Sequence, residues 1–354
     1  MLIGSSFGQE KIPIREVVIE ERKTIFFKIR KEIQNLELHS FQSMNPWIEM
    51  EVTLFLSFIF LFLISVIGLG LFAGFRLLHP KRVRLEESLK AQKESHEIPE
   101  PFWKQTPEFF RIDSDFGYKL TGNYIRGTTN RVIIFCHGIS WNRLGALKYM
   151  NYFLENGWHI FYYDHRGAGE SGGTYPSFGR FEKFDLGKIV DYALALLPKT
   201  ETIGLHGESM GGATVLQYSI MDPRIQFIVA ICPFTSLKGL IRFYMEKLYI
   251  PRPIQPIIRV VINSYLYYYG GFSTHDVYPE DDILQSPIPV LLFHGKKDAK
   301  VPFEMSQSLY RKRKEIYPTE FYASETSGHT PGLYFDLREI IEEKTKAFIE
   351  KYQN

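Results

Sequence analysis

The sequence predicts an α/β fold, a mostly parallel central sheet with helices on both faces and a cap insertion, preceded by one transmembrane helix. Three observations support this prediction. From residue 107 onward, short β-rich runs alternate with helical patterns, which is typical of parallel strands joined by crossover helices. A Gly-x-Ser-x-Gly pentapeptide, Gly207–Gly211, lies between a strand pattern and a helix pattern. An uncharged apolar run, Val52–Phe75, precedes the alternating region and is long enough to cross a bilayer.

The composition is that of a large folded domain with an appendage. The chain has 354 residues, of which 45% are hydrophobic and 15% aromatic, so it can bury a sizeable core. Its net charge of +2 gives no electrostatic footprint for nucleic acid, and we expect no such partner. Cys136 and Cys232 lie in strand-like apolar runs, which indicates buried free thiols. No Cys/His spacing suits a metal, and the sequence indicates neither a cofactor nor an obligate protein partner.

Residues 1–51 carry mixed charges and only a loose helical pattern, and the sequence assigns them no function. Met44 and Met50 stand just ahead of the apolar run. Either one is an alternative start that would leave residues 1–43 out of the cellular protein. The intact mass of natively expressed protein distinguishes these alternatives.

The run Val52–Phe75 predicts a transmembrane anchor, with the lipid bilayer as its partner. At about 1.5 Å per residue it spans about 36 Å as a helix, which exceeds the hydrocarbon core of a bilayer. A buried core helix is the less favoured alternative, because such helices rarely run so long without a polar face. A cleaved signal peptide is also less favoured, because its apolar region is shorter.

The basic residues around the span predict a cytoplasmic catalytic domain. Six Lys or Arg follow the span within twenty residues: Arg76, Lys81, Arg82, Arg84, Lys90 and Lys93. Residues 31–51 hold only Lys31, so the positive-inside rule places the C-terminal side in the cytoplasm. The charges from Arg15 to Lys31 act the other way if residues 1–43 are present. Residues 76–106, charged and interrupted by prolines, predict a linker.

Residues 107–354 are expected to form the α/β domain. Strands are predicted at Tyr118–Ile125, Arg131–Cys136, Trp158–Asp164, Thr202–His206, Phe227–Cys232, Pro289–His294 and Thr319–Ala323. Helices are predicted at Leu144–Glu155, Phe181–Leu197, Met210–Ile220, Glu304–Lys314 and Leu337–Tyr352. The insertion 233–285 interrupts the alternation.

The pentapeptide around Ser209 predicts a nucleophile on a sharp turn from strand to helix. Such a turn strains the backbone at the serine and requires small neighbours, which Gly207 and Gly211 supply. The amide of Met210, at the N-terminus of the following helix, would then point at a developing oxyanion. A Gly-x-Ser-x-Gly match alone is weak evidence, and here the strand and helix patterns on either side strengthen it.

A serine hydroxyl needs a base to accept its proton and a carboxylate to hold that base. The acid candidate is Asp298, four residues past the end of the predicted strand 289–294. Asp276, Asp281 and Asp282 compete for this role, but they lie in or beside the insertion and not at a strand end.

Position in the chain nominates the base. His329 is the only histidine that follows Asp298, and it lies in a loop after the last predicted strand. The resulting chain order, serine then aspartate then histidine, is one in which catalytic triads occur. His137, His206 and His294 each end a strand, and we interpret them as structural residues that hydrogen-bond across strand-end loops.

Two further loops lie at strand ends. The run Cys136–Ile139 brings a glycine to the end of its strand, so the backbone N–H of Ile139 is the candidate second oxyanion donor. The glycine-rich run 163–173 lacks the third glycine and the lysine of a nucleotide site, and we interpret it as a structural loop pinned by Asp164 and Arg166. Glu208, beside the nucleophile, either supports the structure or contacts substrate.

A family resemblance rests on five motifs in order: His137-Gly138, Asp164 to Gly173, Gly207 to Gly211, His294-Gly295 with Asp298, and Gly328-His329. Over about residues 107–354 the chain resembles the α/β-hydrolase superfamily. It is most similar to bacterial membrane-anchored hydrolases and more distantly to abhydrolase-domain depalmitoylase-like proteins. The resemblance does not choose a substrate, because this fold serves esterases, thioesterases, lipases and peptidases.

These observations predict a membrane-anchored serine hydrolase. Ser209 would attack an ester or thioester, His329 would carry the proton, Asp298 would orient His329, and the amides of Ile139 and Met210 would hold the oxyanion. The insertion 233–285, which corresponds to the cap of such enzymes, is rich in apolar residues that pack as core or line an acyl-sized pocket. The alternatives are a serine peptidase on the same fold and a catalytically idle binding or scaffold protein.

Overall fold

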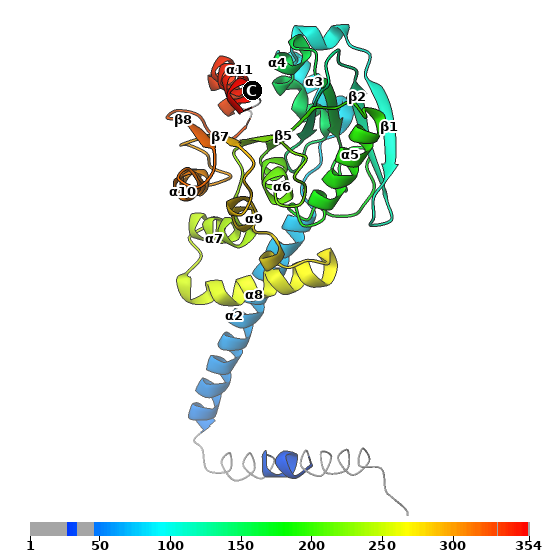
Figure 1. Cartoon of the computed structure of the whole chain (residues 1–354). Coiled ribbons are helices and arrows are strands. Elements are labelled where there is room, and N and C mark those ends of the chain that lie inside the picture. The colour runs from blue at the N-terminus through cyan, green and yellow to red at the C-terminus, as the bar shows by residue number, and fades with distance from the viewer. Residues whose placement is uncertain (1–26, 34–45, 331, 353–354) are drawn as a thin grey trace, which may run out of the picture. The chain divides into compact units, whose positions relative to one another are not determined.

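The computed structural model describes residues 27–33, 46–330 and 332–352 (Figure 1). The chain divides into two compact units, residues 1–65 and 66–354. Most of the predicted N-terminal segment 1–51, including the alternative start at Met44, lies outside the described residues. The second unit holds the sheet, and its description follows.

One eight-stranded sheet forms the centre of the second unit, in the order β1-β2-β4-β3-β5-β6-β7-β8. β2 runs antiparallel to β1 and β4, and every other neighbouring pair is parallel. The strands are β1 (Glu108–Asp113), β2 (Lys119–Ile125), β3 (Arg131–Cys136), β4 (His159–Tyr163), β5 (Thr202–Glu208), β6 (Phe227–Ile231), β7 (Val290–Gly295) and β8 (Thr319–Ser324). The mostly parallel sheet of the prediction is therefore confirmed.

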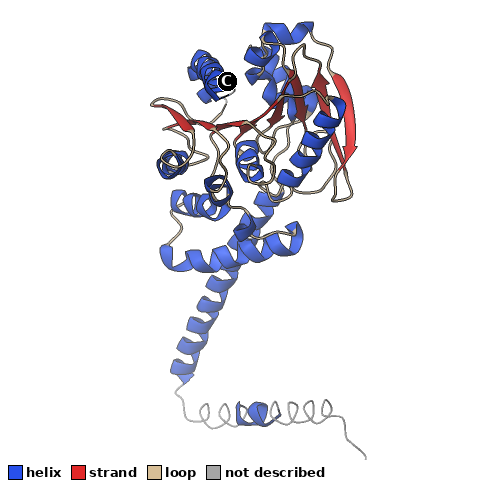
Figure 2. Ribbon diagram, in the orientation of Figure 1, coloured by secondary structure: helices blue, strands red, loops and turns tan. Residues whose placement is uncertain are grey.

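Helices cover both faces of the sheet, as Figure 2 shows. The helical elements are α2 (Pro46–Leu78), α3 (Leu85–Glu94), η1 (Glu100–Lys104), η2 (Arg143–Tyr149), α4 (Asn151–Glu155), α5 (Glu182–Leu196), α6 (Met210–Tyr218), α7 (Leu237–Lys247), η3 (Arg252–Ile254), α8 (Gln255–Tyr265), η4 (Leu266–Gly270), η5 (Thr274–Asp276), α9 (Pro279–Leu284), α10 (Phe303–Arg313) and α11 (Gly332–Tyr352). One apolar core packs α5 and α6 on the sheet, and the other packs η2, α4 and α11 on the opposite face.

Two elements differ from the sequence prediction. β1 (Glu108–Asp113) was not expected, because it is an edge strand whose side chains are mostly exposed and give little alternation. The helix predicted at 144–155 is a 3₁₀ turn, η2, followed by the short α4. Asn142 caps that turn by accepting a hydrogen bond from the Leu144 amide (3.1 Å).

The segment 76–106, predicted to be a linker, contains α3 and η1 and lies within the second compact unit. The backbone N–H of Val83 donates to the Ser140 carbonyl (2.9 Å). The side-chain amide of Asn142 donates to the Val83 carbonyl (3.1 Å). The Gln92 side chain, buried on α3, donates to the Leu144 carbonyl (2.8 Å). Ile98 is buried in the apolar core, and Leu89 and Phe102 pack against it, so hydrogen bonds and apolar contacts together hold this segment.

Within the described residues, α2 is the one helix long and apolar enough to cross a membrane. Its C-terminal part, from Val66 to Leu78, belongs to the second unit and packs against α8 (Figure 1). A β-carbon at Gly70 would lie 2.7 Å from Cβ of Val261, and one at Gly74 would lie 2.9 Å from the Tyr265 side chain. The two glycines, four residues apart, therefore let the helices approach closely, as small residues do between membrane helices.

We predict that Gly70→Ala and Gly74→Ala each destabilise the second unit by about 1–3 kcal/mol, because the added methyl groups overpack the contact with α8. Gly68→Ala is the matched control, since a β-carbon there meets no atom within 4 Å. The measurement is the melting temperature of the full chain in detergent. Equal melting temperatures for all three variants would contradict the packing described above.

Candidate active site

Ser209 occupies the sharp turn between β5, which ends at Glu208, and α6, which begins at Met210. Its backbone has φ 54°, a strained conformation for a residue with a side chain. A β-carbon at Gly207 would lie 2.3 Å from the Gly211 carbonyl oxygen, and one at Gly211 would lie 2.1 Å from the Cys136 carbonyl oxygen. Only glycine fits at these two positions, and the strain at Ser209 is maintained by that close packing.

The structure brings Ser209, His329 and Asp298 together from three separate loops. Nε2 of His329 lies 3.0 Å from the Ser209 hydroxyl oxygen, and Nδ1 lies 2.5 Å from Oδ2 of Asp298. With the proton on Nδ1 donated to the carboxylate, Nε2 is free to accept the serine proton. The three side chains nominated from the sequence thus form one hydrogen-bonded chain.

Asp298 lies just past the end of β7, and its carboxylate is well supplied with donors. Oδ1 accepts the backbone N–H groups of Lys300 (2.7 Å) and Val301 (2.9 Å), and Nε2 of His294 lies 3.2 Å from Oδ2. Burial raises the pKa of Asp298, but hydrogen bonds from His294 and His329 outweigh it and hold that pKa below its usual range. Asp298 is therefore ionised at neutral pH.

The competing aspartates have other partners. The Asp276 carboxylate accepts from the backbone and hydroxyl of Ser273, at 2.6 and 2.8 Å, in the turn at η5. Asp282 pairs with Lys183 at 3.4 Å on α9. The geometry therefore favours Asp298 over both as the partner of His329.

Ile139 and Met210, the residue after Ser209, line the same small cavity. Gly138 packs closely on the nucleophile turn, since a β-carbon there would lie 3.5 Å from Cβ of Ser209. Among the described residues, neither the Ile139 amide nor the Met210 amide has a hydrogen-bond acceptor. Both N–H groups are therefore available to a substrate oxygen, as expected of an oxyanion hole.

Glu208 links the nucleophile turn to the loop that carries the base. Its carboxylate accepts from the Thr330 hydroxyl (2.9 Å) and the Tyr149 hydroxyl (2.8 Å), and it forms a buried ion pair with Lys148 (2.7 Å). Burial raises the pKa of Glu208, but Lys148 and these hydrogen bonds lower it below its usual value. Glu208 thus has a supporting role. The sequence analysis missed Lys148, because nothing in a helical pattern marks a lysine whose ammonium is buried.

The loop after β4 is also a structural one. The Asp164 carboxylate accepts the backbone amides of Arg143 (2.7 Å) and Glu170 (2.9 Å) and forms an ion pair with the Arg143 guanidinium. Arg166 stacks over the rings of Tyr118 and Phe181. The first residue is held by hydrogen bonds as predicted, whereas the second is held by ring contacts.

The cap packs its apolar inner surface next to Ser209. Met210 shares one buried cluster with residues of α7 and α8, and Ile139 packs against that cluster. Tyr267 and Tyr268, two aromatic residues of the insertion 233–285, are exposed on the outside of the cap and do not line a pocket beside Ser209. The inner surface of the cap therefore adjoins the oxyanion donors, while these tyrosines face away from the core.

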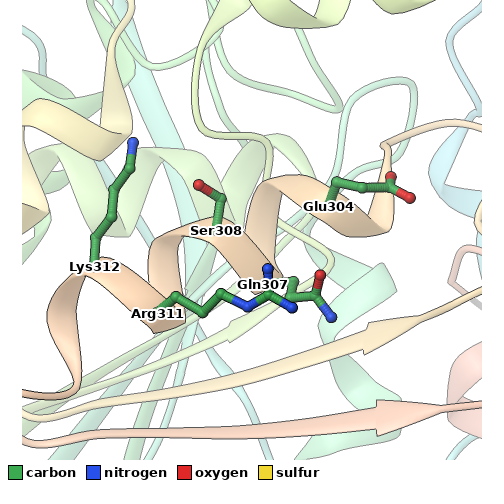
Figure 3. A pocket seen from close by; sticks show the side chains of 5 residues that line it. All are labelled: Glu304, Gln307, Ser308, Arg311 and Lys312. Atoms are coloured by element: carbon green, nitrogen blue, oxygen red, sulfur yellow. The ribbon is translucent and has the colours of Figure 1, made fainter.

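A group of possible metal ligands and a surface hollow on α10 are two further candidate sites. Ligand atoms of Cys232, Asp298 and His329 lie within 4.8 Å of one another. Two of these three groups, Asp298 and His329, are already hydrogen-bonded to each other, and His329 also to Ser209. The hollow in Figure 3 is lined by side chains of α10 alone, including Ser308 and Lys312. Its serine has no histidine among those lining residues.

We predict that Lys148→Met lowers the melting temperature markedly, because it leaves the Glu208 carboxylate buried without its cation, at a cost of about 3–5 kcal/mol. The double variant Lys148→Met/Glu208→Gln should regain much of that loss, since no charge then remains buried. Thermal unfolding of the two purified variants provides the comparison. A double variant no more stable than the single one would show that the pair does not act as described.

We predict that stability falls as the pH decreases from 6.5 to 5. Burial lowers the pKa of three deeply buried histidines. The pKa of His137 is lowered, the pKa of His165 lies well below its usual value, and the pKa of His206 is lowered to about 3. Below pH 6.5 the unfolded chain therefore binds protons that the folded chain does not, which costs about 1.4 kcal/mol per pH unit for each histidine. Melting temperatures at pH 7, 6 and 5 test this, and His206→Gln should reduce the slope. A melting temperature constant over this range would contradict it.

Comparison with known proteins supports the same fold. Residues 127–267 match the family model described as "Serine aminopeptidase, S33". The chain is 32% identical to the uncharacterized protein YqkD of Bacillus subtilis, over 81% of this chain and 93% of that protein. It is 25% identical to the AB hydrolase superfamily protein YisY of the same organism, over 63% of this chain and 92% of that protein. Esterase Pf2001 of Pyrococcus furiosus superposes with a TM-score of 0.59 at 20% identity, over 71% of this chain and 93% of that one.

The structural likeness shows the fold, and the identity to YqkD extends over most of both proteins. Together with the strand order and the strained serine between β5 and α6, these findings lead to one conclusion: the chain belongs to the α/β-hydrolase superfamily, as its motifs predicted.

Proposed function

We propose that this protein is a membrane-anchored serine hydrolase that cleaves an acyl ester or thioester. The observation that carries the proposal is the hydrogen-bonded chain from Ser209 through His329 to Asp298. A serine at a strained turn, a histidine in reach of it and an ionised carboxylate behind that histidine supply the three groups that acyl transfer needs.

The proposed reaction has two halves. Ser209 attacks the substrate carbonyl while Nε2 of His329 takes the hydroxyl proton, and the imidazolium is stabilised by Asp298. The carbonyl oxygen becomes an oxyanion that accepts hydrogen bonds from the amides of Ile139 and Met210. His329 then passes its proton to the leaving alcohol or thiol. In the second half, water attacks the acyl-enzyme with His329 as base, and Ser209 regains its proton.

The chemistry around the site supports an acyl substrate. The oxyanion residue Met210 and the inner surface of the cap share one apolar cluster, which suits a hydrocarbon chain better than a peptide. The likeness to esterase Pf2001 agrees with ester cleavage. The described residues thus favour an apolar acyl group, and no further group is needed for the proposed steps.

A serine peptidase is the second candidate, favoured by the family model matched at residues 127–267, whose description is that of an aminopeptidase. An aminopeptidase has to hold the substrate's ammonium group with carboxylates. Among the acidic groups of the cap, Glu246 pairs with Arg242, Asp276 accepts from Ser273, Glu280 pairs with Lys312 and Asp282 with Lys183, while Asp281 is exposed on α9. A kcat/KM for aminoacyl anilides above that for acyl esters would replace the ester proposal.

We predict that Ser209→Ala, Asp298→Asn and His329→Ala each reduce kcat for a soluble ester by about 10⁴- to 10⁶-fold, because the three groups act as a unit. Ser209→Ala should also abolish labelling by a fluorophosphonate probe. Ser308→Ala on α10 is the matched control and should label normally (Figure 3). Ester hydrolysis by Ser209→Ala at the wild-type rate would refute the proposed mechanism. A wild-type protein that neither reacts with the probe nor hydrolyses esters would instead favour an idle binding protein.

The anchor belongs to the same proposal. α2 is long and apolar enough to cross a bilayer, and the basic residues that follow it favour a cytoplasmic catalytic domain. We predict that protease added to sealed spheroplasts leaves this domain intact and cuts it only after lysis. Cleavage in sealed spheroplasts would reverse the orientation.

A further inference from the structure

α8 is apolar on two opposite faces. Its inner face, with Ile258, Ile262 and Leu266 at its end, is buried in the cap cluster. Its outer face carries exposed apolar or aromatic side chains, continued into η4: Ile257, Val260, Tyr267 and Tyr268. Tyr267 is 70% exposed and Tyr268 81%. The remaining side of α8 is polar, with Arg259 and Asn263, so an apolar surface is left exposed next to the buried face.

The outer face of α8 adjoins the C-terminal part of α2. Val261 and Tyr265 of α8 meet α2 at Gly70 and Gly74, and both glycines lie inside the uncharged run Val52–Phe75. Leu71 of α2 lines the same surface hollow as Val260, Tyr267 and Tyr268. Phe72 and Phe75 of α2, in the same part of the helix, are also exposed. We name Ile257, Val260, Tyr267, Tyr268 and Leu71 the membrane face.

The position of this contact along α2 fixes the depth of α8. A bilayer core takes about 20 residues of helix, so an apolar run ending at Phe75 brings Gly70 and Gly74 to its C-terminal boundary. α8, which crosses α2 there (Figure 1), would then lie at the boundary between hydrocarbon and headgroups. Tyrosine is enriched at that boundary, because its ring is apolar and its hydroxyl reaches water.

Basic residues flank the membrane face. Arg252 precedes α8 and is exposed, Arg259 lies on α8 and is half-buried, and Arg76 follows the uncharged run. Guanidinium groups at this level complement anionic lipid headgroups. The apolar surface and its charged border thus fit one occupant, the bilayer that α2 crosses.

We propose that the membrane face rests in the interfacial layer of that bilayer, and that acyl substrate enters the active site from the lipid. This inference rests on the anchor and the acyl chemistry proposed above. The entry route is apolar up to the active site. The inner face of α8 and Met210, the neighbour of Ser209, belong to one apolar cluster. Moving between two apolar surroundings spares a hydrocarbon chain the free-energy cost of exposure to water, which is why we place the entry of acyl substrate at α8.

The depth of the membrane face can be measured with spin labels on the full chain in liposomes of phosphatidylcholine and phosphatidylglycerol. Cys136 and Cys232 are buried, so an introduced cysteine is the preferred site of labelling. Val260→Cys and Tyr268→Cys probe the membrane face, and the exposed positions Phe109→Cys and Ile316→Cys are matched controls elsewhere on the catalytic unit. Collisions with oxygen report lipid, and collisions with a water-soluble nickel chelate report water.

At positions 260 and 268 we expect more collisions with oxygen than with nickel, and the reverse at 109 and 316. Nickel collisions at 260 and 268 equal to those at the controls would overturn the inference, as would protection from both reagents, which would indicate a second protein copy on this face. Flotation of the liposomes is measured in parallel. Protein that fails to float refutes the anchor itself and so is distinguished from an anchored protein whose cap stays in water.

Activity gives an independent test. Val260→Asp/Tyr268→Asp should lower hydrolysis of a long-chain ester embedded in the liposomes by about tenfold, because the added charges withdraw the face from the interface. Hydrolysis of a soluble short-chain ester should stay unchanged, as should both activities of Ile316→Asp. An equal rate on the embedded ester would overturn the inference. A wild-type protein that hydrolyses neither the embedded nor the soluble ester would refute the proposed function instead.

Discussion

The strained backbone of Ser209 is the constraint on which the rest of the catalytic unit depends. To hold φ at 54°, β5 and α6 must meet so closely that the chain has room only for glycine at positions 207 and 211. The Ser209 amide also donates to the Ile231 carbonyl at the end of β6 (2.8 Å), so a neighbouring strand fixes the turn as well. Since parallel strands end at one edge of the sheet, the loops that carry Asp298 and His329 reach the serine from β7 and β8.

Glu208 connects this turn with the base. Its carboxylate accepts a hydrogen bond from the hydroxyl of Thr330, the residue that follows His329. The same carboxylate forms an ion pair with Lys148 of η2. A buried ion pair contributes little net stability when intact, but it is costly to break. Its value here is geometric, because it holds the base loop against the nucleophile turn independently of the hydrogen bond between His329 and Ser209.

The C-terminal end of α2 is part of the second compact unit and packs into its core. Val66 and Leu78 are buried in the same cluster as the inner face of α8 and Met210, and the glycines between them allow the close packing. The Val83 carbonyl and amide then bind the loop that follows Ile139. The position of Ile139, the candidate oxyanion donor, therefore depends on the segment that directly follows α2.

The sequence by itself determined the alternating elements, the mostly parallel sheet, the turn at Ser209 and the order of the three site residues. These follow from local periodicity and from the rule that parallel strands end at one edge, so neighbouring residues suffice to predict them. Tertiary structure alone decided the rest. It brought Asp298 and His329 within hydrogen-bond distance of each other, paired Lys148 with Glu208, and packed α3 and the glycines of α2 into the second unit. Each of these depends on contacts between residues far apart in the chain, which composition and spacing do not encode in any one segment.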